Sequence, residues 1–457
     1  MFSILIIINI FILIYRYIYK MILNISEEYV DFLYDFFKGG IEMPIKNNGF
    51  NMSFIKYKNR YIFITRNVYP IKNVIEKKQL IPGISKSSYK KFVEKTKEYI
   101  IENSNLSEDY IWSWRTFYQS SIIFVGDLDS ELNIKIDKNI KPYGIINPIF
   151  CLNAKENNKT SCSHYFTNSE DYRIYEYRNR IYIINSSINV INQVIIKENS
   201  INVFNKYNNI CNPVINMNNY NIPSNSNEYL KIYEKNWTLY KVDFENNKER
   251  LFTFFHDFSR NGIESVEYNP ITKKCKKYTI VTYPENTFPI GTNIVRFSFG
   301  STSIFFNSKT RNGYLGVGHL KIRLRKNEDG EKTKIEKYFY NLFLKIHTNY
   351  KKIFKQKYKP HHVSQYSFFF FLYDERNKKF YISDFFLPII KYKYFFNIVF
   401  PMSIIKDKNN VILSMGYGDY TNIFIKYTNA EIENIPLYDV SNLDVTKLKL
   451  KLITQSM

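Results

Sequence analysis

Short apolar and aromatic runs, broken by polar turns, dominate the chain and predict β-strands. The segments KYKNRYIFI (56–64) and EYRNRIYII (176–184) share one pattern, in which a Lys/Arg-Asn turn separates two aromatic-rich strands. This pattern is typical of a β-hairpin. Looser copies of it begin at Glu245, Asn307, Asp374 and Asp407. Recurring hairpins without alternating helices favour an all-β propeller or sandwich over a doubly wound α/β sheet.

Two segments have a helical pattern instead. Ser26-Glu27-Glu28 precedes a stretch that stops at Gly39-Gly40, which predicts a short capped helix within a lead-in at 24–46. A second helical stretch is predicted at 87–103, inside an insertion at 87–111. The body at 47–430 is expected to form the β-structure, and 431–457 is expected to be a C-terminal tail.

The N-terminus is strongly apolar. Residues 2–15 are almost wholly hydrophobic, and the run through Leu23 reaches the roughly 20 residues of a membrane helix if Arg16 and Lys20 snorkel. We therefore predict membrane localisation by a single pass, with residues 1–23 as a signal anchor or transmembrane segment. Arg16 and Lys20 follow the run and favour a cytosolic body, whereas several N-x-[S/T] sequons suit a lumen, so the side is left open. A start at Met21 would remove the anchor.

Charge and cysteine spacing narrow the choice of partners. Lys and Arg total 64 against 42 Asp and Glu, which gives a net charge of +22. The lysines are spread along the chain and no helical or RNP-type motif occurs, so we predict no specific nucleic-acid site. The cysteines show no CxxC spacing, and we predict neither a metal site nor another cofactor. A Cys151–Cys162 disulfide and free buried thiols are both left open.

Several motifs follow one another along the chain. They are FNMSFIKYKNRYIFITR (50–66), SEDYRIYEYRNRIYII (169–184), EKNWTLY (234–240), GSTSIFF with YLGVGHLKI (300–322) and ILSMGYGDYTN (412–422). In this order they resemble the superfamily of five-bladed propellers that includes glycoside hydrolases, mannoside phosphorylases and β-mannosyltransferases. The resemblance implies an all-β, five-bladed β-propeller that makes or breaks a glycosidic bond, as a glycosyltransferase, phosphorylase or hydrolase. The implied ligand is a glycan, a sugar phosphate or a nucleotide sugar.

The resemblance also implies an acidic residue at the propeller axis. Glu170, Asp171 and Arg173 are similar to the superfamily's Glu-Asp-x-Arg signature, with Tyr172 where proline is usual. Cleavage of a glycosidic bond needs a proton donor, and Asp171 is the predicted catalytic acid or base. Neighbouring side chains of a strand alternate between its faces, so only one of the two acids is expected at the axis. Arg173 can tune Asp171 or bind an anionic substrate group; alternatively the pair holds adjacent blades together.

Further substrate-binding residues are expected from the other motifs: Arg66, Asn236, Trp237, His319 and Asp419. Trp237 offers a stacking face for a sugar ring, although a place in the core is the alternative. His319 follows Gly316-x-Gly318, where glycines permit a close backbone approach to phosphate or a sugar hydroxyl. Asp419 is either an axial residue or a plain turn aspartate.

Two other functions are left open. Asp127-x-Asp129 follows an apolar strand, and two such carboxylates can hold a divalent ion in a nucleotide-sugar glycosyltransferase. A propeller that has lost catalysis and serves as a glycan-binding or structural protein is the other alternative, because a fold does not determine a function.

Overall fold

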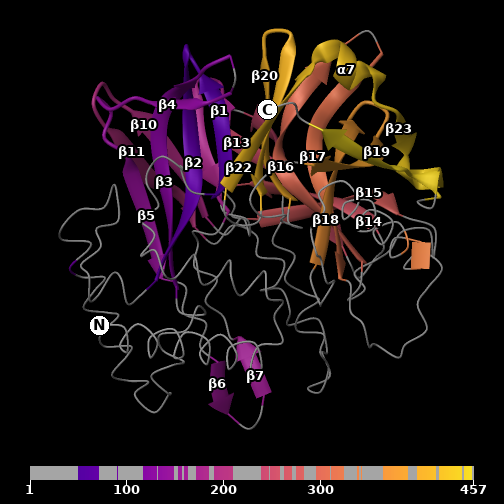
Figure 1. Cartoon of the computed structure of the whole chain (residues 1–457), viewed down its shortest axis with the longest axis horizontal. Coiled ribbons are helices and arrows are strands. Elements are labelled where there is room, and N and C mark those ends of the chain that lie inside the picture. Colours follow the sequence, from indigo (N-terminus) through magenta and orange to yellow (C-terminus); the bar gives the residue numbers. More distant parts are fainter. Residues whose placement is uncertain are drawn as a thin grey trace, which may run out of the picture.

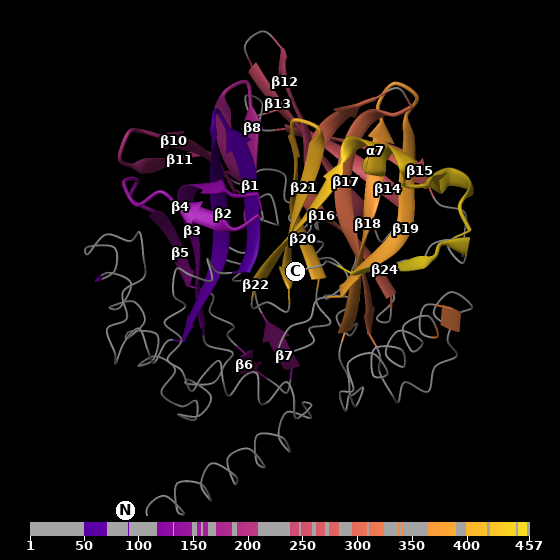
Figure 2. The same cartoon turned by 45° about the horizontal axis from the view of Figure 1, so that its top comes forward.

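The computed structural model describes the strands of the chain and few other residues. The described residues are 50–70, 90, 117–130, 132–148, 153–156, 159–162, 171–184, 190–208, 238–245, 248–257, 262–269, 274–282, 295–308, 310–323, 337–338, 341, 364–389, 399–417, 421–444 and 447–454. Within them the protein is all-β, as predicted, and its sheets have a propeller-like arrangement (Figures 1 and 2).

The first two sheets are formed by strands that follow one another along the chain. Sheet 1 is five-stranded and contains β1 (Phe50–Tyr57), β2 (Arg60–Pro70), β3 (Phe117–Leu128), β4 (Ile134–Ile136) and β5 (Tyr143–Pro148). A separate hairpin of β6 (Asn153–Glu156) and β7 (Lys159–Cys162) follows. Sheet 2 then contains β8 (Arg173–Tyr177), β9 (Arg180–Ile184), β10 (Val190–Ile196) and β11 (Ile201–Asn208).

Three further sheets complete the described fold. Sheet 3 contains β12 (Thr238–Glu245), β13 (Lys248–Asp257), β14 (Gly262–Asn269) and β15 (Lys274–Thr282). Sheet 4 contains β16 (Val295–Asn307), β17 (Asn312–Arg323), β18 (Ser364–Asp374), β19 (Lys379–Ile389), β23 (Leu437–Asp439) and β24 (Leu450–Thr454). Sheet 5 contains β20 (Val399–Asp407), β21 (Asn410–Tyr417) and β22 (Thr421–Thr428).

The first strands of the sheets face one another at the centre. Strand β1 contacts β8 and β20, and β16 contacts β12, β20 and β8. Both views show sheet 5 between sheet 1 and sheet 4, with its strands beside β1 on one side and β16 on the other (Figures 1 and 2). The last sheet thus lies against the first, which is how a propeller avoids exposed sheet edges.

The predicted hairpins are confirmed. Lys58-Asn59 joins β1 to β2, and Arg178-Asn179 joins β8 to β9. Lys58, Arg178 and Asn179 have positive φ, as tight hairpin turns require. The looser copies are the β12–β13, β16–β17, β18–β19 and β20–β21 hairpins. Five of the six copies are therefore the first two strands of a sheet, so the repeat marks the blades.

Strands β1 and β2 are buried on both faces. Aromatic side chains of one face pack toward sheet 5: Phe54, Tyr61 and Phe63. Isoleucines of the other face pack toward sheet 2: Ile55, Ile62 and Ile64. Successive side chains of a strand point to opposite faces, so a strand between two neighbours reads as one continuous apolar run. A larger apolar cluster joins sheets 3, 4 and 5.

Buried hydroxyl groups connect successive first strands. The amide of Ile174 donates to Ser53 Oγ at 3.1 Å, and the amide of Phe54 donates to Ser403 Oγ at 3.1 Å. The amide of Ile404 donates to Thr302 Oγ1 at 3.3 Å. Each hydroxyl lies at a break in the pairing register of its own sheet, in β1, β20 and β16. Such an irregularity frees backbone groups, and the hydroxyls bind the freed amides of the next sheet.

The predicted C-terminal tail contributes to sheet 4. Strand β23 pairs antiparallel with β19 and β24 pairs parallel with it, after the short helix α7 (Asn429–Asn434). Arg311 donates to the carbonyls of Ile432 and Ile435 at the end of this helix. The segment after 430 is therefore part of the propeller-like body rather than an appendage.

Several predictions lie outside the described residues. They are the anchor at 1–23, the helix in the lead-in at 24–46, and all of the helical insertion at 87–111 except Lys90, which is helical. Among the helices that the structure describes, none is long and apolar enough to span a bilayer. Anchoring through residues 1–23 stays a prediction.

The hydroxyl bridges predict a specific stability loss. Replacing Ser403 with alanine removes the acceptor of the buried Phe54 amide and a 2.8 Å contact with Ser414, whose hydroxyl still donates to the carbonyl of Met52. We expect the free energy of unfolding to fall by about 2 kcal/mol, measured by urea denaturation. Ser130→Ala, on an exposed turn, is the control and should change it by less than about 0.5 kcal/mol. Equal effects of the two substitutions would contradict the structural role of the bridge.

Candidate functional site

Asp171 is held at the start of sheet 2 by two residues of sheet 1. Asn51 Nδ2 donates to Asp171 Oδ1 at 2.8 Å, and Arg66 donates to the same oxygen at 3.1 Å. Asn51 and Asp171 are 3% and 4% exposed, and both have positive φ, at 49° and 50°. Asn and Asp tolerate this backbone conformation better than other side chains that carry a Cβ. The Asn51 amide of β1 and the Asp171 carboxylate before β8 thus lie face to face.

Both hydrogen bonds fall on one carboxylate oxygen. Asp171 Oδ1 accepts from a neutral amide and from a guanidinium, whereas neither bond involves Oδ2. An oxygen that already accepts two donors is poorly suited to carry a proton. Oδ2 is therefore the oxygen that suits proton transfer. This geometry was not foreseen from the sequence, which paired Asp171 with Arg173 rather than with Arg66.

Arg173 crosses the centre of the molecule. Its side chain is 1% exposed, and Nε donates to the carbonyl of Gly300 in sheet 4. The guanidinium lies 6.0 Å from the ring centroid of Phe400 in sheet 5. Arg173 thus joins sheet 2 to sheets that do not follow it directly in the chain. The arginine that pairs with Asp171 is Arg66, so the predicted Asp171–Arg173 pair gives way to two separate contacts.

His319 meets the same aromatic ring. It is 3% exposed, and its ring centroid lies 4.8 Å from that of Phe400 and 5.6 Å from that of Tyr366. Arg173 and His319 therefore share Phe400 as a neighbour, although they come from sheets 2 and 4. The structure thus places Arg173 at the start of β8 with Asp171 just before it, and places His319 on β17 beside the Phe400 ring that Arg173 also contacts.

The glycines before His319 have a different role from the predicted one. A Cβ on Gly316 would lie 2.2 Å from the ring of Phe371, and one on Gly318 would lie 2.4 Å from the ring of Phe369. Both rings come from the neighbouring strand β18 and fill the space above the glycines. The interpretation that these glycines admit a ligand is therefore wrong. They admit core phenylalanines.

Gly416 leaves room for the side chain of Asn51, whose amide donates to Asp171. A Cβ at this position would lie 1.8 Å from Asn51 Oδ1, so only glycine leaves room for the Asn51 side chain. In the same sheet, Asn422 Oδ1 accepts from the amide of Met52 at 2.8 Å. The motif of sheet 5 thus contacts the site through Gly416 and Asn422. Its predicted residue Asp419 lies outside the described residues.

Four further residues belong to the predicted motifs. Asn236, Trp237 and Glu170 lie outside the described residues. Tyr172, which stands where proline is usual, is 3% exposed and packs in the apolar cluster between sheets 1 and 2. The side chain therefore contributes to the core beside Asp171.

Asp127 lies near the end of β3, and Asp129 lies in the turn that follows it. Asp129 accepts from the backbone amide of Asn133 at 2.9 Å and from its side chain at 3.3 Å, which closes the turn between β3 and β4. Asp127 is exposed on β3 and pairs in register with Lys135. Within the described part of the chain, no three His, Cys, Asp or Glu side chains gather as metal ligands. Asp129 thus has a structural role in this turn, and the alternative in which Asp127 and Asp129 hold a divalent ion stays a hypothesis.

Sequence reasoning missed Asn51, Gly416 and Phe400. Asn51 lies 120 residues from Asp171, so their contact depends on the packing of two sheets. One signal was present: Asn51 and Arg66 are the outermost polar residues of the two strands of a single hairpin motif, at the end opposite its turn. Two polar residues at that end of an otherwise apolar hairpin indicate a shared polar site.

The comparisons with known proteins concern the fold. No family model matches the chain, and no curated protein matches it. Among solved structures, the chain is similar to the β-1,2-mannobiose phosphorylase of Listeria innocua, with 13% identity, 84% of this chain and 90% of that chain covered, and a TM-score of 0.40. It is also similar to two proteins of Leishmania mexicana. They are the mannose phosphorylase MPT-4 (10% identity, 86% and 88% covered, TM-score 0.37) and the GDP-Man-dependent mannosyltransferase MPT-1 (8%, 86% and 89%, 0.37).

These are kinds of protein that the sequence motifs resemble. The class of molecule is an all-β body of propeller-like sheets, and its candidate site is the polar cluster around Asp171.

The Gly416 contact predicts a non-additive pair of substitutions. Gly416→Ala should displace the Asn51 amide and lower the free energy of unfolding by about 1 to 3 kcal/mol, because the new Cβ overlaps Oδ1. In a chain that carries Asn51→Gly, the same substitution should cost much less. A double-mutant cycle by urea denaturation measures the difference. An equal cost in both chains would contradict the contact.

Proposed function

We propose that the protein is a carbohydrate-active enzyme that makes or breaks a glycosidic bond at the centre of a five-bladed propeller, with Asp171 as the acid or base. The single observation that carries this proposal is the asymmetric environment of the carboxylate. Asn51 and Arg66 both bind Oδ1, and neither bond involves Oδ2. A carboxyl group that is positioned through one oxygen can transfer a proton through the other.

The chemical step follows from this geometry. In cleavage, the proton on Asp171 Oδ2 passes to the bridging oxygen while the bond between that oxygen and the anomeric carbon breaks. Water, phosphate or a sugar hydroxyl attacks the anomeric carbon and forms the new bond, the proton that this nucleophile loses passes to solvent, and solvent returns a proton to Asp171 before the next turnover. Arg66 and Asn51 then stabilise the carboxylate that remains, because both donate to it. Bond formation is the same sequence in reverse.

Arg173 and His319 are the proposed neighbours of the sugar. Both are buried against Phe400, and Arg173 lies two residues after Asp171 in the chain. A guanidinium and an imidazole suit a phosphate group or sugar hydroxyls as binding partners. Asn236, Trp237 and Asp419 complete the proposed binding residues. A glycan, a sugar phosphate or a nucleotide sugar is the proposed ligand.

A non-catalytic glycan-binding or structural protein is the second candidate. The same bonds from Asn51 and Arg66 tie the start of sheet 2 to sheet 1, and buried pairs of this kind also serve structure alone. In that case the carboxylate is a link between sheets, and its loss would affect folding rather than turnover.

A matched pair of variants separates the two functions. The first variant is Asp171→Asn. The control is Asp407→Asn, because Asp407 is also held by a cation and a neutral donor, Lys56 at 2.5 Å and Tyr61 at 2.7 Å, at the other end of β1. Turnover is assayed with manno- and gluco-oligosaccharides plus phosphate and with nucleotide sugars. We expect Asp171→Asn to lower turnover by about 100-fold or more, and Asp407→Asn to leave it within about twofold.

Thermal unfolding of both variants completes the experiment. A folded Asp171→Asn protein with full turnover would overturn the acid or base role. An absence of turnover in the native protein with every donor, together with retained glycan binding in both variants, would support the non-catalytic candidate instead.

A further inference from the structure

A crevice lies between sheets 1 and 2, at the ends of the strands away from Asp171. It has a volume of about 310 Å³ and an apolar floor formed by Ile62, Val125, Ile140 and Ile196. The β1–β2 turn and the β10–β11 turn form its rim, with Tyr57, Lys58 and Lys197 among the lining residues. Strand β1 has eight residues, and Asn51 lies near its start while Lys58 follows its end. At about 3.3 Å per residue, roughly 20 Å separates the crevice from the candidate active site.

The turns around the crevice carry an excess of positive charge. Five exposed basic side chains, called here the basic corner, lie on the turns of the β1–β2, β8–β9 and β10–β11 hairpins: Lys58, Arg60, Arg178, Arg180 and Lys197. The same three turns carry two acidic side chains, Glu176 and Glu198. Arg60 pairs with Asp137 on an adjacent loop, and that loop adds the exposed Lys138 and Lys141. The corner as a whole therefore attracts anions.

These turns form one surface. The hydroxyl of Tyr57 donates to the carbonyl of Asn179 at 3.4 Å, which joins the β1–β2 turn to the β8–β9 turn. The amide of Lys141 donates to the carbonyl of Asn199 at 3.2 Å, which joins the adjacent loop to the β10–β11 turn. The Glu176 carboxylate accepts from the amide of Asn179 at 2.7 Å and so serves its own turn.

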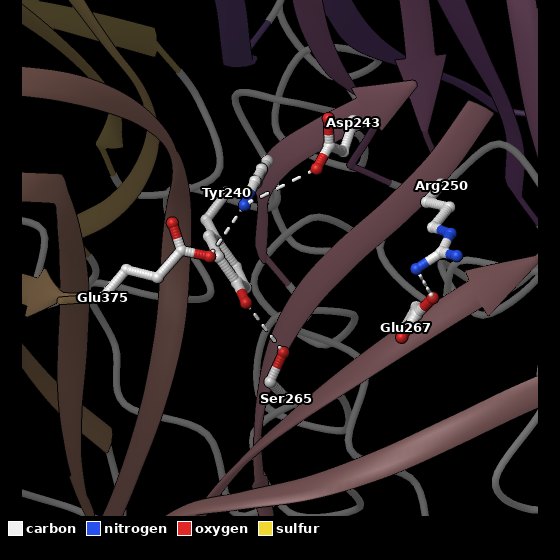
Figure 3. A network of polar contacts seen from close by, with 7 residues as sticks. Tyr240, Asp243, Arg250, Ser265, Glu267 and Glu375 are labelled. Atoms are coloured by element: carbon white, nitrogen blue, oxygen red, sulfur yellow. Dashed lines mark hydrogen bonds and ion pairs between the residues drawn. The ribbon is translucent and has the colours of Figure 1, made fainter. Parts of the chain in front are cut away.

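The β12–β13 and β18–β19 hairpins of sheets 3 and 4 differ from this corner. There, Lys241 lies 2.8 Å from Glu375 and 3.8 Å from Asp243, and Arg250 lies 3.1 Å from Glu267 (Figure 3). The β18–β19 turn itself carries Asp374 and Glu375 beside its basic residues. Around these two hairpins, Lys241 and Arg250 are each paired with acidic groups. A net charge spread evenly over the surface would not produce such a difference.

We propose that the basic corner and its crevice bind an anionic oligosaccharide, as a site separate from Asp171. Sugar rings have apolar faces that suit the aliphatic floor and the Tyr57 ring, and carboxylate or phosphate substituents suit the cationic rim. A crevice admits a chain end better than a flat bilayer, and it lacks the aromatic platforms on which successive nucleic-acid bases stack. The site would hold a charged glycan on the protein whatever the reaction at Asp171.

Isothermal titration calorimetry with a tetramer of galacturonic acid tests the proposal, with maltotetraose as the neutral counterpart. We expect the acidic tetramer to bind more tightly than maltotetraose and to lose affinity as salt is added. The variant Lys58→Glu with Lys197→Glu should bind the acidic tetramer at least about tenfold more weakly. Lys58→Gln with Lys197→Gln should show a smaller loss, because it removes the attraction without adding repulsion.

The matched control is Arg376→Glu with Lys378→Glu on the β18–β19 turn. It changes the net charge by the same amount, and Lys378 shares the positive φ of Lys58, at 52° and 55°. This control should bind within about twofold of the native protein. Equal losses in both charge-reversed variants would overturn the site in favour of general attraction. An absence of tetramer binding would also overturn it. Stronger binding of a single-stranded RNA or of phosphatidylserine vesicles, lost with Lys58 and Lys197, would replace the proposed ligand by that partner.

Discussion

Strand β1 has to pack against two neighbouring sheets and form hydrogen bonds with both, and the rest of the structure depends on this constraint. One face packs aromatic side chains against sheet 5, and the other packs isoleucines against sheet 2. Ser53 Oγ accepts a hydrogen bond from the amide of Ile174 in sheet 2. The amide of Phe54 donates a hydrogen bond to Ser403 Oγ in sheet 5. Because β1 lies between the second sheet and the last one, its position closes the ring of sheets. The second residue of the same strand is Asn51, whose amide binds Asp171.

Closure and the candidate chemistry are therefore physically linked. Gly416 of sheet 5 leaves room for the Asn51 side chain, and Asn422 of the same sheet binds the next amide of β1. The carboxylate of Asp171 depends on Asn51 and Arg66, which the β1–β2 hairpin brings side by side. Residues of sheets 1, 2 and 5 together position this carboxylate, so its position does not depend on a long loop. Rigid surroundings of this kind suit a group that must meet one bond in one orientation.

Local sequence patterns predicted the repeated hairpins better than they predicted the contacts around Asp171. The Lys-Asn and Arg-Asn turns predicted hairpins because a tight turn depends on a few adjacent residues. Asp171 was found from its motif, whereas its partner Asn51 lies 120 residues away and depends on how two sheets pack. Gly316 and Gly318 were misread for a related reason, because the rings that cover them come from β18. The segment after 430 was taken for a tail because its strands are short and complete a sheet whose other members lie far earlier in the sequence.

The central claim is that Asp171 Oδ2 meets the bridging oxygen of a bound sugar. A crystal structure of Asp171→Asn with an oligosaccharide that the native protein turns over tests this most directly. The account predicts that the side-chain atom in the place of Oδ2 lies about 3 Å from the bridging oxygen, with Arg66 and Asn51 unchanged. A sugar bound with its bridging oxygen beyond the reach of residue 171 would contradict the account.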